Sequence, residues 1–348
     1  MLAFRAVGAP FVTIAIPCFN EERHIEACLE DVFAQDYPAD RFEVLVADGM
    51  STDLTRDILH GISTRHPDRL RIIDNPRRLQ APAMNAMIGA ARGEVIVRMD
   101  VHARYASDYV RQCVAVLEET GADNVGGAQR AVAETWFQRA LCAALDSPLG
   151  VGGARYRDPS TEGFVDTVFL GAFKRKVFDA VGGYDDNAVT NEDAELNQRI
   201  LAAGGKVFLS PRIVVNYAPR SSFRTLSRQY FKYGKGRART LLKHKRYPTI
   251  RPALPFLMVV GGATLLVVPP LQLLAPVAFG LYGAAALVEG IRVSRRHGLA
   301  LAPVAAAIFP VLHVSHGVGF ATGLAQYALH PDWHPSTPVS PPRSAAQS

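Results

Sequence analysis

Short apolar runs alternate with stretches of helical character through the first hundred residues. The apolar runs predict strands over residues 12–16, 43–47, 70–73 and 93–99. The stretches between them predict helices over residues 22–34, 51–60 and 81–91, and Ser51 is expected to be the N-cap of the second. Strands that alternate with helices indicate βαβ units and a largely parallel sheet. We therefore expect an α/β fold in this part of the chain.

The pattern is less regular in the next ninety residues. Residues 165–169 and 206–209 predict two further strands. A helix is expected over residues 191–203, where Gly204 and Gly205 end the pattern. These elements would extend the same sheet.

Three apolar stretches follow nearer the C-terminus, over residues 254–274, 275–293 and 299–325. Each is close to the roughly 20 residues that a helix needs to cross a bilayer. Pro269–Pro270 marks a tight turn between the first two, and basic residues flank the pair. A hairpin with both ends in the cytoplasm fits the positive-inside rule. The third stretch either spans, re-enters or packs on the others, so two or three spans are expected.

The net charge of +6 comes from one short segment of the chain. Residues 1–211 carry a net charge of −8, whereas residues 212–251 contain twelve Lys and Arg and no Asp or Glu. The run from Pro252 to Val288 then has no charged residue at all. Basic sequence beside uncharged apolar sequence indicates a cytoplasmic flank and a membrane, and makes nucleic acid the poorer partner.

Two sets of residues recur with a helical period in the basic segment. The basic set is Arg220, Arg224, Arg228 and Lys232, and the apolar set is Phe223, Leu226 and Tyr230. We expect a helix at the membrane interface within residues 220–250. The alternative is an ordinary amphipathic helix that covers a core.

The cysteines and the N-terminus favour a cytosolic location for the first part of the chain. The four cysteines form no CxxC pair and have no metal-ligand spacing, so reduced, packed thiols are expected. The first apolar run is broken by Pro17 after a few residues, which argues against a cleaved signal peptide.

Candidate chemistry begins where the apolar run over residues 93–99 ends. Asp100 and His102 follow it directly, at the position where an open α/β sheet binds ligands. In an extended backbone, residues two apart point to the same side, so these two side chains would share one divalent ion. A carboxylate and an imidazole suit Mn²⁺ or Mg²⁺ on a diphosphate. An Asp after a strand is also common in a solvated turn or a helix cap.

Four short polar motifs follow one another along the chain. They are PCFNEE over residues 17–22, ADGMSTD over 47–53, DVH over 100–102 and NED over 191–193. Their order resembles that of the family 2 glycosyltransferases of GT-A fold, whose motifs read P-x-x-N-E, D-G-S-x-D, D-x-D and E-D. The resemblance covers about residues 11–235. The chain is most similar to membrane-attached members that build bacterial exopolysaccharides, the succinoglycan-type glucosyltransferases, which tolerate D-x-H and carry a Tyr-Gly-x-Gly-Arg run, here residues 233–237.

The resemblance implies a site for a UDP-sugar donor. Asp48 would hydrogen-bond the uracil edge, and Pro17, Asn20 and Glu21 would line the nucleotide pocket. The family often has a Gly-Lys-Gly-like segment before its A-x-N pair. This chain has Leu79–Ala81 there, so the usual cation is missing, and Arg77 or Arg78 would replace it. Without the resemblance, Asp48 would be read as the cap of a turn.

The resemblance also implies the catalytic groups. Asp100 would hold Mn²⁺ or Mg²⁺ on the diphosphate, with His102 as second ligand or neighbour. Asp193 would be the base that takes the proton of the acceptor hydroxyl, with Glu192 beside it. Without the resemblance, Glu192 and Asp193 would be acids that complement a helix dipole. Many members carry a further His ligand after the late strand, and residues 214–217 contain none.

We therefore expect an inverting, metal-dependent enzyme of exopolysaccharide biosynthesis in the bacterial inner membrane, with its catalytic domain in the cytoplasm. The expected parts are a GT-A domain over residues 1–219, the basic helix region over 220–250, membrane helices over 251–328 and a disordered tail over 329–348. A hexose, glucose from UDP-glucose in the first instance, would be moved to a polyprenyl-diphosphate-linked sugar. Other exopolysaccharide assembly proteins are candidate partners.

Three alternatives remain at this point. A processive polysaccharide synthase would need the Gln-x-x-Arg-Trp signature, which residues 228–232 only partly match. A non-catalytic membrane scaffold would use the sheet only to bind nucleotide. A Rossmann oxidoreductase is the poorest of the three, because no Gly-x-Gly-x-x-Gly follows the first predicted strand.

Overall fold

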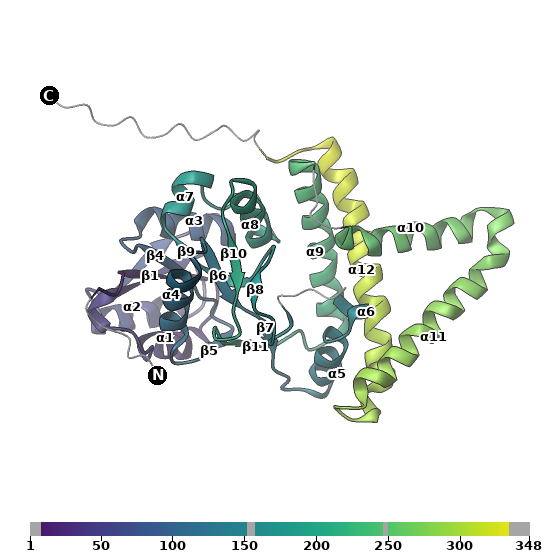
Figure 1. Ribbon diagram of the computed structural model, residues 1–348, viewed down its shortest axis with the longest axis horizontal. Helices are drawn as coiled ribbons and strands as arrows, with labels where there is room; N and C mark the ends of the chain where they lie inside the picture. The colour runs from purple at the N-terminus through teal and green to yellow at the C-terminus, as the bar shows by residue number, and fades with distance from the viewer. Residues whose placement is uncertain (1–7, 152–156, 246–249, 334–348) are drawn as a thin grey trace.

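A computed structural model describes residues 8–151, 157–245 and 250–333 of the chain (Figure 1). Its main sheet has eight strands in the order β3-β2-β1-β4-β9-β6-β10-β8. Their bounds in that order are Leu70–Asp74, Phe42–Asp48, Val12–Cys18, Val95–Arg98, Phe169–Lys174, Asn124–Gly127, Val207–Leu209 and Gly163–Phe164. The first four strands are parallel, and β9 runs antiparallel to both of its neighbours. The predicted α/β fold with a mostly parallel sheet is confirmed.

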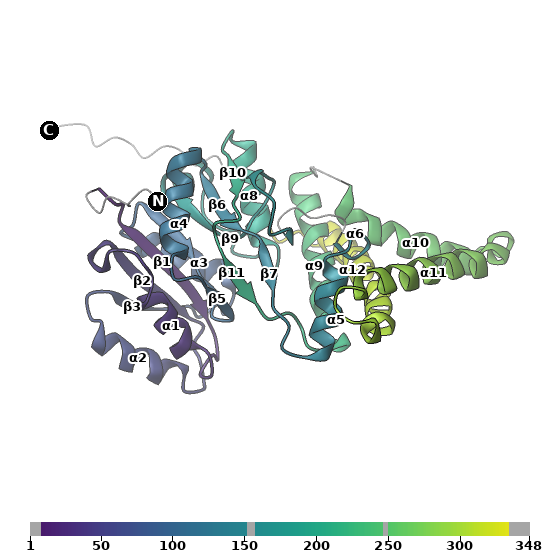
Figure 2. The same cartoon turned by 60° about the horizontal axis from the view of Figure 1, so that its bottom comes forward.

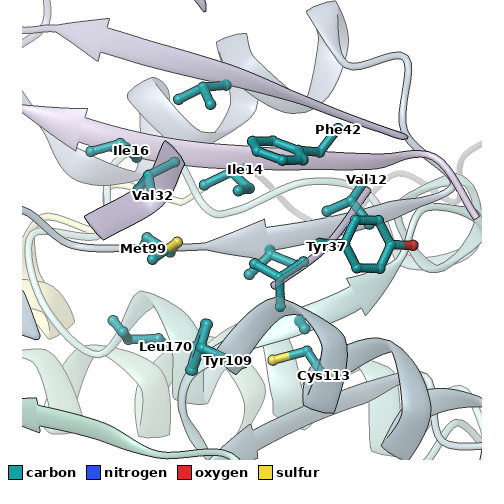
Figure 3. Close-up of a cluster of buried hydrophobic side chains, with 14 of the residues drawn as sticks. Val12, Ile14, Ile16, Val32, Tyr37, Phe42, Met99, Tyr109, Cys113 and Leu170 are labelled. Carbon is teal, nitrogen blue, oxygen red and sulfur yellow. The ribbon is translucent and has the colours of Figure 1, made fainter. Parts of the chain in front are cut away.

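Helices cover both faces of this sheet. One face packs against α1 (Ile25–Phe33), α2 (Thr55–Arg65) and α4 (Tyr109–Thr120), and the other against α3 (Gln80–Ala90), α7 (Lys176–Val181) and α8 (Glu192–Ala202). Figure 3 shows the first core, where Ile14 of β1 and Tyr109 of α4 are fully buried. The alternation of strand residues between two apolar faces explains the continuous apolar runs in the sequence.

A small second sheet has three strands. It has the order β5-β11-β7, with bounds Ala103–Tyr105, Val215–Tyr217 and Gln129–Ala131. Strand β5 follows β4 after only four residues, so the chain must turn between them. The turn is closed by a hydrogen bond from the Ala103 N–H to the Asp100 carbonyl.

Three details of the sequence-based prediction are wrong. Ser51 does not cap α2, which begins at Thr55, because the Ser51 hydroxyl instead donates to Asp48 at 2.6 Å. Residues 165–169 are not one strand, since β8 ends at Phe164 and β9 begins at Phe169. Residues 254–274 are not one helix either. Val268 is extended and Pro269–Pro270 follow, and proline disfavours helical backbone before it.

A helical part lies beside the main sheet. Its C-terminal helices are α9 (Phe223–His244), α10 (Leu254–Val267), the 3₁₀ helix η4 (Pro269–Leu274), α11 (Ala275–Ser294) and α12 (Ala302–Leu329), and two helices from the middle of the chain, α5 (Trp136–Leu145) and α6 (Pro148–Val151), pack with them. Helices α9 and α12 run side by side, while α10 and α11 project away from them (Figures 1 and 2). Buried side chains of α5, α9 and α12 form a separate core. The predicted disordered tail falls largely on residues 334–348, outside the described residues.

By length and composition, two helical segments are apolar enough to cross a membrane. They are Pro269–Ser294 and Leu299–Leu329, and the shorter apolar helix Arg251–Val267 precedes them. The basic helix was predicted from Arg220 onward, but α9 begins at Phe223, with the Ser222 hydroxyl as its cap. Arg220 therefore lies before the helix and not on its basic face.

Candidate active site

The polar motifs gather at the carboxyl ends of the parallel strands. Cys18 at the end of β1 lies beside Asp48 at the end of β2, and Asp100 follows β4. Strand order places β1 between β2 and β4, so residues far apart in the sequence meet at this edge. This is where an open α/β sheet binds its ligands.

The Asp48 carboxylate is fully buried and held by several donors. It accepts hydrogen bonds from the backbone N–H and hydroxyl of Ser51 and from Arg56 at 3.2 Å. Arg56 also pairs with Asp74 at 2.5 Å, which ties the ends of β2 and β3 together. Sequence reasoning missed Arg56. Its position in the first turn of α2, eight residues after Asp48, was the available signal.

The first two motifs are joined by hydrogen bonds between their loops. Asn20, whose φ is +55°, accepts a bond from the Thr52 N–H at 2.9 Å. The Glu21 N–H donates to the Thr55 hydroxyl at 2.6 Å. Pro17 lies within β1, opposite Ala47 of β2. The structure thus brings Pro17, Asn20 and Glu21 to the same edge as Asp48.

The Arg98 side chain connects the third motif, residues 100–102, with the fourth, residues 191–193. Its side chain is 4% exposed and its Nε donates to the Asp100 carboxylate at 3.1 Å. Its Nη1 donates to Asp193 and lies 3.6 Å from Glu192. Among the residues that the structure describes, three carboxylates therefore surround this guanidinium, which leaves a formal charge of −2.

Sequence reasoning missed Arg98, although a signal for it existed. It is a cation in an otherwise apolar strand, two residues before Asp100, and residues two apart in a strand share a face. The missing information was the partner, because Arg98 and Asp193 are 95 residues apart.

The surroundings of the site raise the pKa values of two of its carboxyl groups. Burial raises the pKa of Glu192, and the neighbouring Asp193 raises it further. Burial also raises the pKa of Asp193, and the Arg98 guanidinium opposes that shift. The Asp193 side chain still keeps 24% of its surface exposed, so a ligand can reach it. Groups with perturbed acidity in a cleft are candidates for proton transfer.

The side chains of Asp100 and His102 bond different partners in this structure. They lie in the turn between β4 and β5, so the extended backbone assumed from the sequence is absent at these residues. Asp100 faces Arg98, whereas the His102 Nε2 lies 2.8 Å from Glu21. That hydrogen bond raises the pKa of His102. Ligand atoms of Glu21, His24 and His102 lie within 4.8 Å of one another.

The donor set at this edge suits a hard or borderline divalent ion. Asp100 offers carboxylate oxygens at 32% exposure, and His102 and Glu21 line a separate hollow of about 210 Å³. Oxygen and imidazole donors are the ligands that Mg²⁺ and Mn²⁺ accept. The surplus negative charge around Arg98 also favours a cation. The residues present therefore fit such an ion.

The arginines near α3 take different partners. Arg77 donates to Asp186 at 3.1 Å and to Asn187 at 2.8 Å, in the loop before α8. Arg78 has a φ of +55° and lies over the ring of Phe19 at 5.3 Å. Arg77 thus points toward the α8 side of the cleft, and Arg78 toward the first motif.

This α/β sheet with acidic groups at its strand ends is the fold of nucleotide-sugar transferases of GT-A type. A mannosyltransferase from Pyrobaculum calidifontis, PcManGT, solved with GDP-Man and Mn²⁺, superposes with a TM-score of 0.62 at 22% identity and covers 92% of this chain and 88% of its own. TarS 1-349 from S. aureus with UDP gives a TM-score of 0.52 at 15% identity over 92% and 91% of the two chains. At these identities the likeness shows the fold alone.

Sequence similarity gives the family. Residues 13–182 match the family described as Glycosyl transferase family 2. The succinoglycan biosynthesis protein ExoA of Rhizobium meliloti (strain 1021) is 35% identical over 311 residues, which are 88% of this chain and 93% of that protein. A dolichyl N-acetyl-alpha-D-glucosaminyl phosphate 3-beta-D-2,3-diacetamido-2,3-dideoxy-beta-D-glucuronosyltransferase of Methanococcus voltae is 31% identical over 71% of this chain and 78% of its own. The chain belongs to glycosyltransferase family 2 and is a glycosyltransferase.

Proposed function

We propose that the protein is an inverting, metal-dependent hexosyltransferase of exopolysaccharide biosynthesis. It moves glucose from UDP-glucose to a polyprenyl-diphosphate-linked sugar at the cytoplasmic face of the bacterial inner membrane. The observation that carries the proposal is the Arg98 centre, where Asp100 and a partly exposed Asp193 meet at the carboxyl edge of the sheet. The relatives support the pathway and the lipid-linked acceptor through their names alone.

Asp193 is the proposed base. The acceptor hydroxyl gives its proton to Asp193 as its oxygen forms a bond to the anomeric carbon, and the bond from that carbon to UDP breaks with its electron pair on the phosphate oxygen. Attack in a single step inverts the configuration at that carbon. Arg98 bonds Asp193 more closely than Glu192, so the guanidinium stabilises the charged form of Asp193 more than that of Glu192.

The donor pocket is proposed at Asp48 and the first motif. Asp48 is fixed by Ser51 and Arg56, and so presents a carboxylate of constant position to the uracil edge. Pro17, Asn20 and Glu21 would line the pocket beside it, and Arg77 or Arg78 would supply the positive charge toward the diphosphate. When bound at Asp100, Mn²⁺ or Mg²⁺ would offset the charge that develops on the departing UDP.

Membrane attachment is the second part of the proposal. Arg224, Arg228 and Lys232 are exposed along α9, and anionic headgroups or the acceptor diphosphate would lie against them. Each such contact contributes on the order of 1 kcal/mol near an anionic surface. Changing the three residues to Gln should weaken vesicle binding or raise the acceptor KM. Unchanged values for both would remove this part of the proposal.

The reaction is tested with detergent-solubilised protein and a screen of UDP-, GDP- and dTDP-sugars, with and without Mn²⁺. We expect metal-dependent UDP release from UDP-glucose once a membrane extract supplies the acceptor. Asp193→Asn should abolish release, and Asp179→Asn, an exposed carboxylate on α7, should leave it unchanged. Release of GDP or dTDP, and not of UDP, would mean that the donor is another nucleotide sugar. Binding without turnover in the presence of extract would favour the scaffold, and long products would favour a processive synthase.

A further inference from the structure

The apolar arm formed by α10, η4 and α11 leaves α12 at one point and returns to it at another. At the first root, a Cβ on Gly317 of α12 would lie 2.4 Å from the Pro255 carbonyl of α10. At the second root, a Cβ on Gly290 of α11 would lie 2.9 Å from the Ala302 carbonyl. Between these roots the two helices diverge from α12 and meet at η4 (Figure 1). The arm and α12 together form a triangle.

The tip of this triangle exposes large apolar side chains. Leu273 is 83% exposed and Val267 is 74% exposed. The polar side chains near the tip are satisfied from within: Gln272 donates to the Leu266 carbonyl at 2.9 Å, and Thr264 to the Val260 carbonyl at 2.9 Å. A turn that crossed a bilayer would lie in water and would normally carry polar or charged residues. This turn is instead suited to the hydrocarbon core of a bilayer, where backbone and polar groups must find hydrogen-bond partners inside the protein.

Helix α12 is fixed along α9 by close backbone contact. A Cβ on Gly319 would lie 2.1 Å from the Phe231 carbonyl, and a Cβ on Gly234 would lie 2.0 Å from the His316 carbonyl. The hydroxyls of Ser227 and Ser315 are 2.9 Å apart. These glycines let the two helices approach too closely for any larger residue.

Helix α9 in turn is fixed to the catalytic domain and is strongly basic. The Thr190 hydroxyl donates to the Lys232 carbonyl at 3.0 Å, and the Asn191 amide to the Tyr233 carbonyl at 3.1 Å. Each basic side chain at the centre of a bilayer costs about 2.5–3.5 kcal/mol on insertion scales. Helix α9 therefore stays at the surface, and α12 cannot cross the membrane without it.

We propose that the α10–η4–α11 arm is re-entrant: it enters the cytoplasmic leaflet and returns to the same face, while α9 and α12 lie along the interface. The 20 residues of α11 extend about 30 Å, the thickness of the hydrocarbon core, but the 14 residues of α10 extend only about 21 Å, so the shorter helix limits the depth that the shared tip reaches. No described helix then crosses the bilayer, in place of the two or three spans expected from the sequence. This inference rests on the membrane attachment proposed above.

The charges at the roots identify the surface that the arm enters. Arg295 and Arg296 follow α11 and are exposed, and Arg251 precedes α10. These arginines flank an arm without charged residues between Pro252 and Val288, and α9, which packs along α12, carries the exposed Arg224 and Arg228. An apolar insert with a basic rim fits a leaflet of anionic lipids. The occupant is therefore the hydrocarbon of such a leaflet.

The test places single cysteines at the tip and at the root. Leu273→Cys and Arg296→Cys are expressed in full-length protein, and the unaltered chain gives the background of its native thiols. A membrane-impermeant thiol reagent is added to sealed inside-out and right-side-out inner-membrane vesicles. We expect Arg296→Cys to react only in inside-out vesicles. Leu273→Cys should react from neither side, and react fully after detergent is added.

The other outcomes overturn the inference in distinguishable ways. Reaction of Leu273→Cys in right-side-out vesicles would show that the hairpin spans the membrane. Reaction in inside-out vesicles would place the tip in water. Protein that remains in the supernatant after ultracentrifugation would remove the attachment itself, while the sugar-transfer assay is a separate measurement. As a second variant, Leu273→Asp should release protein from vesicles of phosphatidylglycerol and phosphatidylethanolamine at least tenfold more than Val132→Asp, an exposed apolar control on the catalytic domain. Equal release would contradict the proposal.

Discussion

Two sides of helix α8 carry carboxylates in opposite electrostatic surroundings. On one side, Asp193 and Glu192 share the Arg98 guanidinium with Asp100. On the other side, Glu195 is bound by Arg199 at 2.8 Å, by Lys243 at 2.8 Å and by His244 at 2.9 Å. Asp193 and Glu195 are two residues apart and therefore point to different sides of the helix, so one short helix holds both clusters. The first cluster has one cation for three acids, whereas in the second cluster Glu195 alone is bonded by two cations, Arg199 and Lys243.

The pKa values of the carboxyl groups in the two clusters follow this difference in charge balance. Burial and mutual repulsion raise the pKa values of Glu192 and Asp193. Burial also acts to raise the pKa of Glu195, but the hydrogen bonds from His244 and Arg199 and the charge of Lys243 outweigh it and hold that pKa far below its usual range. The comparison teaches that burial alone does not give a carboxylate a chemical role. The charge balance around it does.

The second cluster, around Glu195, also joins the α/β domain to the helices α9 and α12. Arg239 of α9 donates to Asp185 at 2.8 Å and to Asp332, beyond α12, at 2.6 Å. Lys243 bonds both Asp185 and Glu195. The helix that carries the proposed base is thus held against the helix that we place at the membrane. A well-compensated cluster of this kind positions the site without taking part in the chemistry.

The largest effect is expected on sugar transfer, from a substitution in the cluster around Arg98. Asp193→Asn should lower sugar transfer by about 10²–10⁴, the usual contribution of a general base. Its thermal midpoint should equal or exceed that of the unaltered protein, because a carboxylate with a raised pKa is costly to keep charged. The measurement is UDP release beside a thermal scan. A large loss of stability would mean that this side is structural as well.

On the other side, the effect should fall on stability. Glu195→Ala removes the buried carboxylate that Arg199 and Lys243 share and leaves Lys243 with Asp185 alone, and removing one member of a buried ion pair costs about 3–5 kcal/mol. The free energy of unfolding in denaturant measures it. Glu119→Ala, which breaks an exposed pair with Arg212, is the matched control and should cost about 0–1 kcal/mol. Equal costs for the two variants would contradict the contrast between the clusters.

A smaller effect is expected from removal of the shared cation. Arg98→Met takes away the positive charge that opposes the raised pKa of Asp193. The acidic limb of the pH–activity profile should then move to higher pH by about one unit, equivalent to about 1.4 kcal/mol. Arg175→Met, at an exposed arginine before α7, should leave the profile in place. An unmoved limb in Arg98→Met would show that Asp193 does not set it.

The smallest effect is the pH dependence of stability, and its sign differs between the clusters. The lowered pKa of Glu195 gives stability that is present above the unfolded value of about 4.3 and is lost as the pH falls toward the folded value. The raised pKa of Asp193 has the opposite sign, because stability increases as the pH falls through the folded value toward the unfolded value of about 3.9. Glu195→Gln should therefore flatten the loss of unfolding free energy below about pH 4.3. Asp193→Asn should flatten the gain on the acidic side of neutrality.

Much of the fold could be predicted from the sequence because its signals are local. The run over residues 43–47 lies within β2, and the run over 70–73 lies within β3. The polar motifs follow their strands as expected. The errors arose where a side chain took a distant partner. Ser51 was expected to cap α2, but it bonds Asp48 and the Asn20 N–H instead.

The sequence by itself determined the family, the strand ends that carry the polar motifs and the apolar character of the C-terminal helices. The tertiary structure alone decided that Arg98 meets Asp193, that Asp100 and His102 turn away from one another, and that α8 separates two opposite charge environments. The physical reason is that periodicity reports on neighbours a few residues apart. Charge balance depends on groups that the strand order brings together from positions nearly a hundred residues apart.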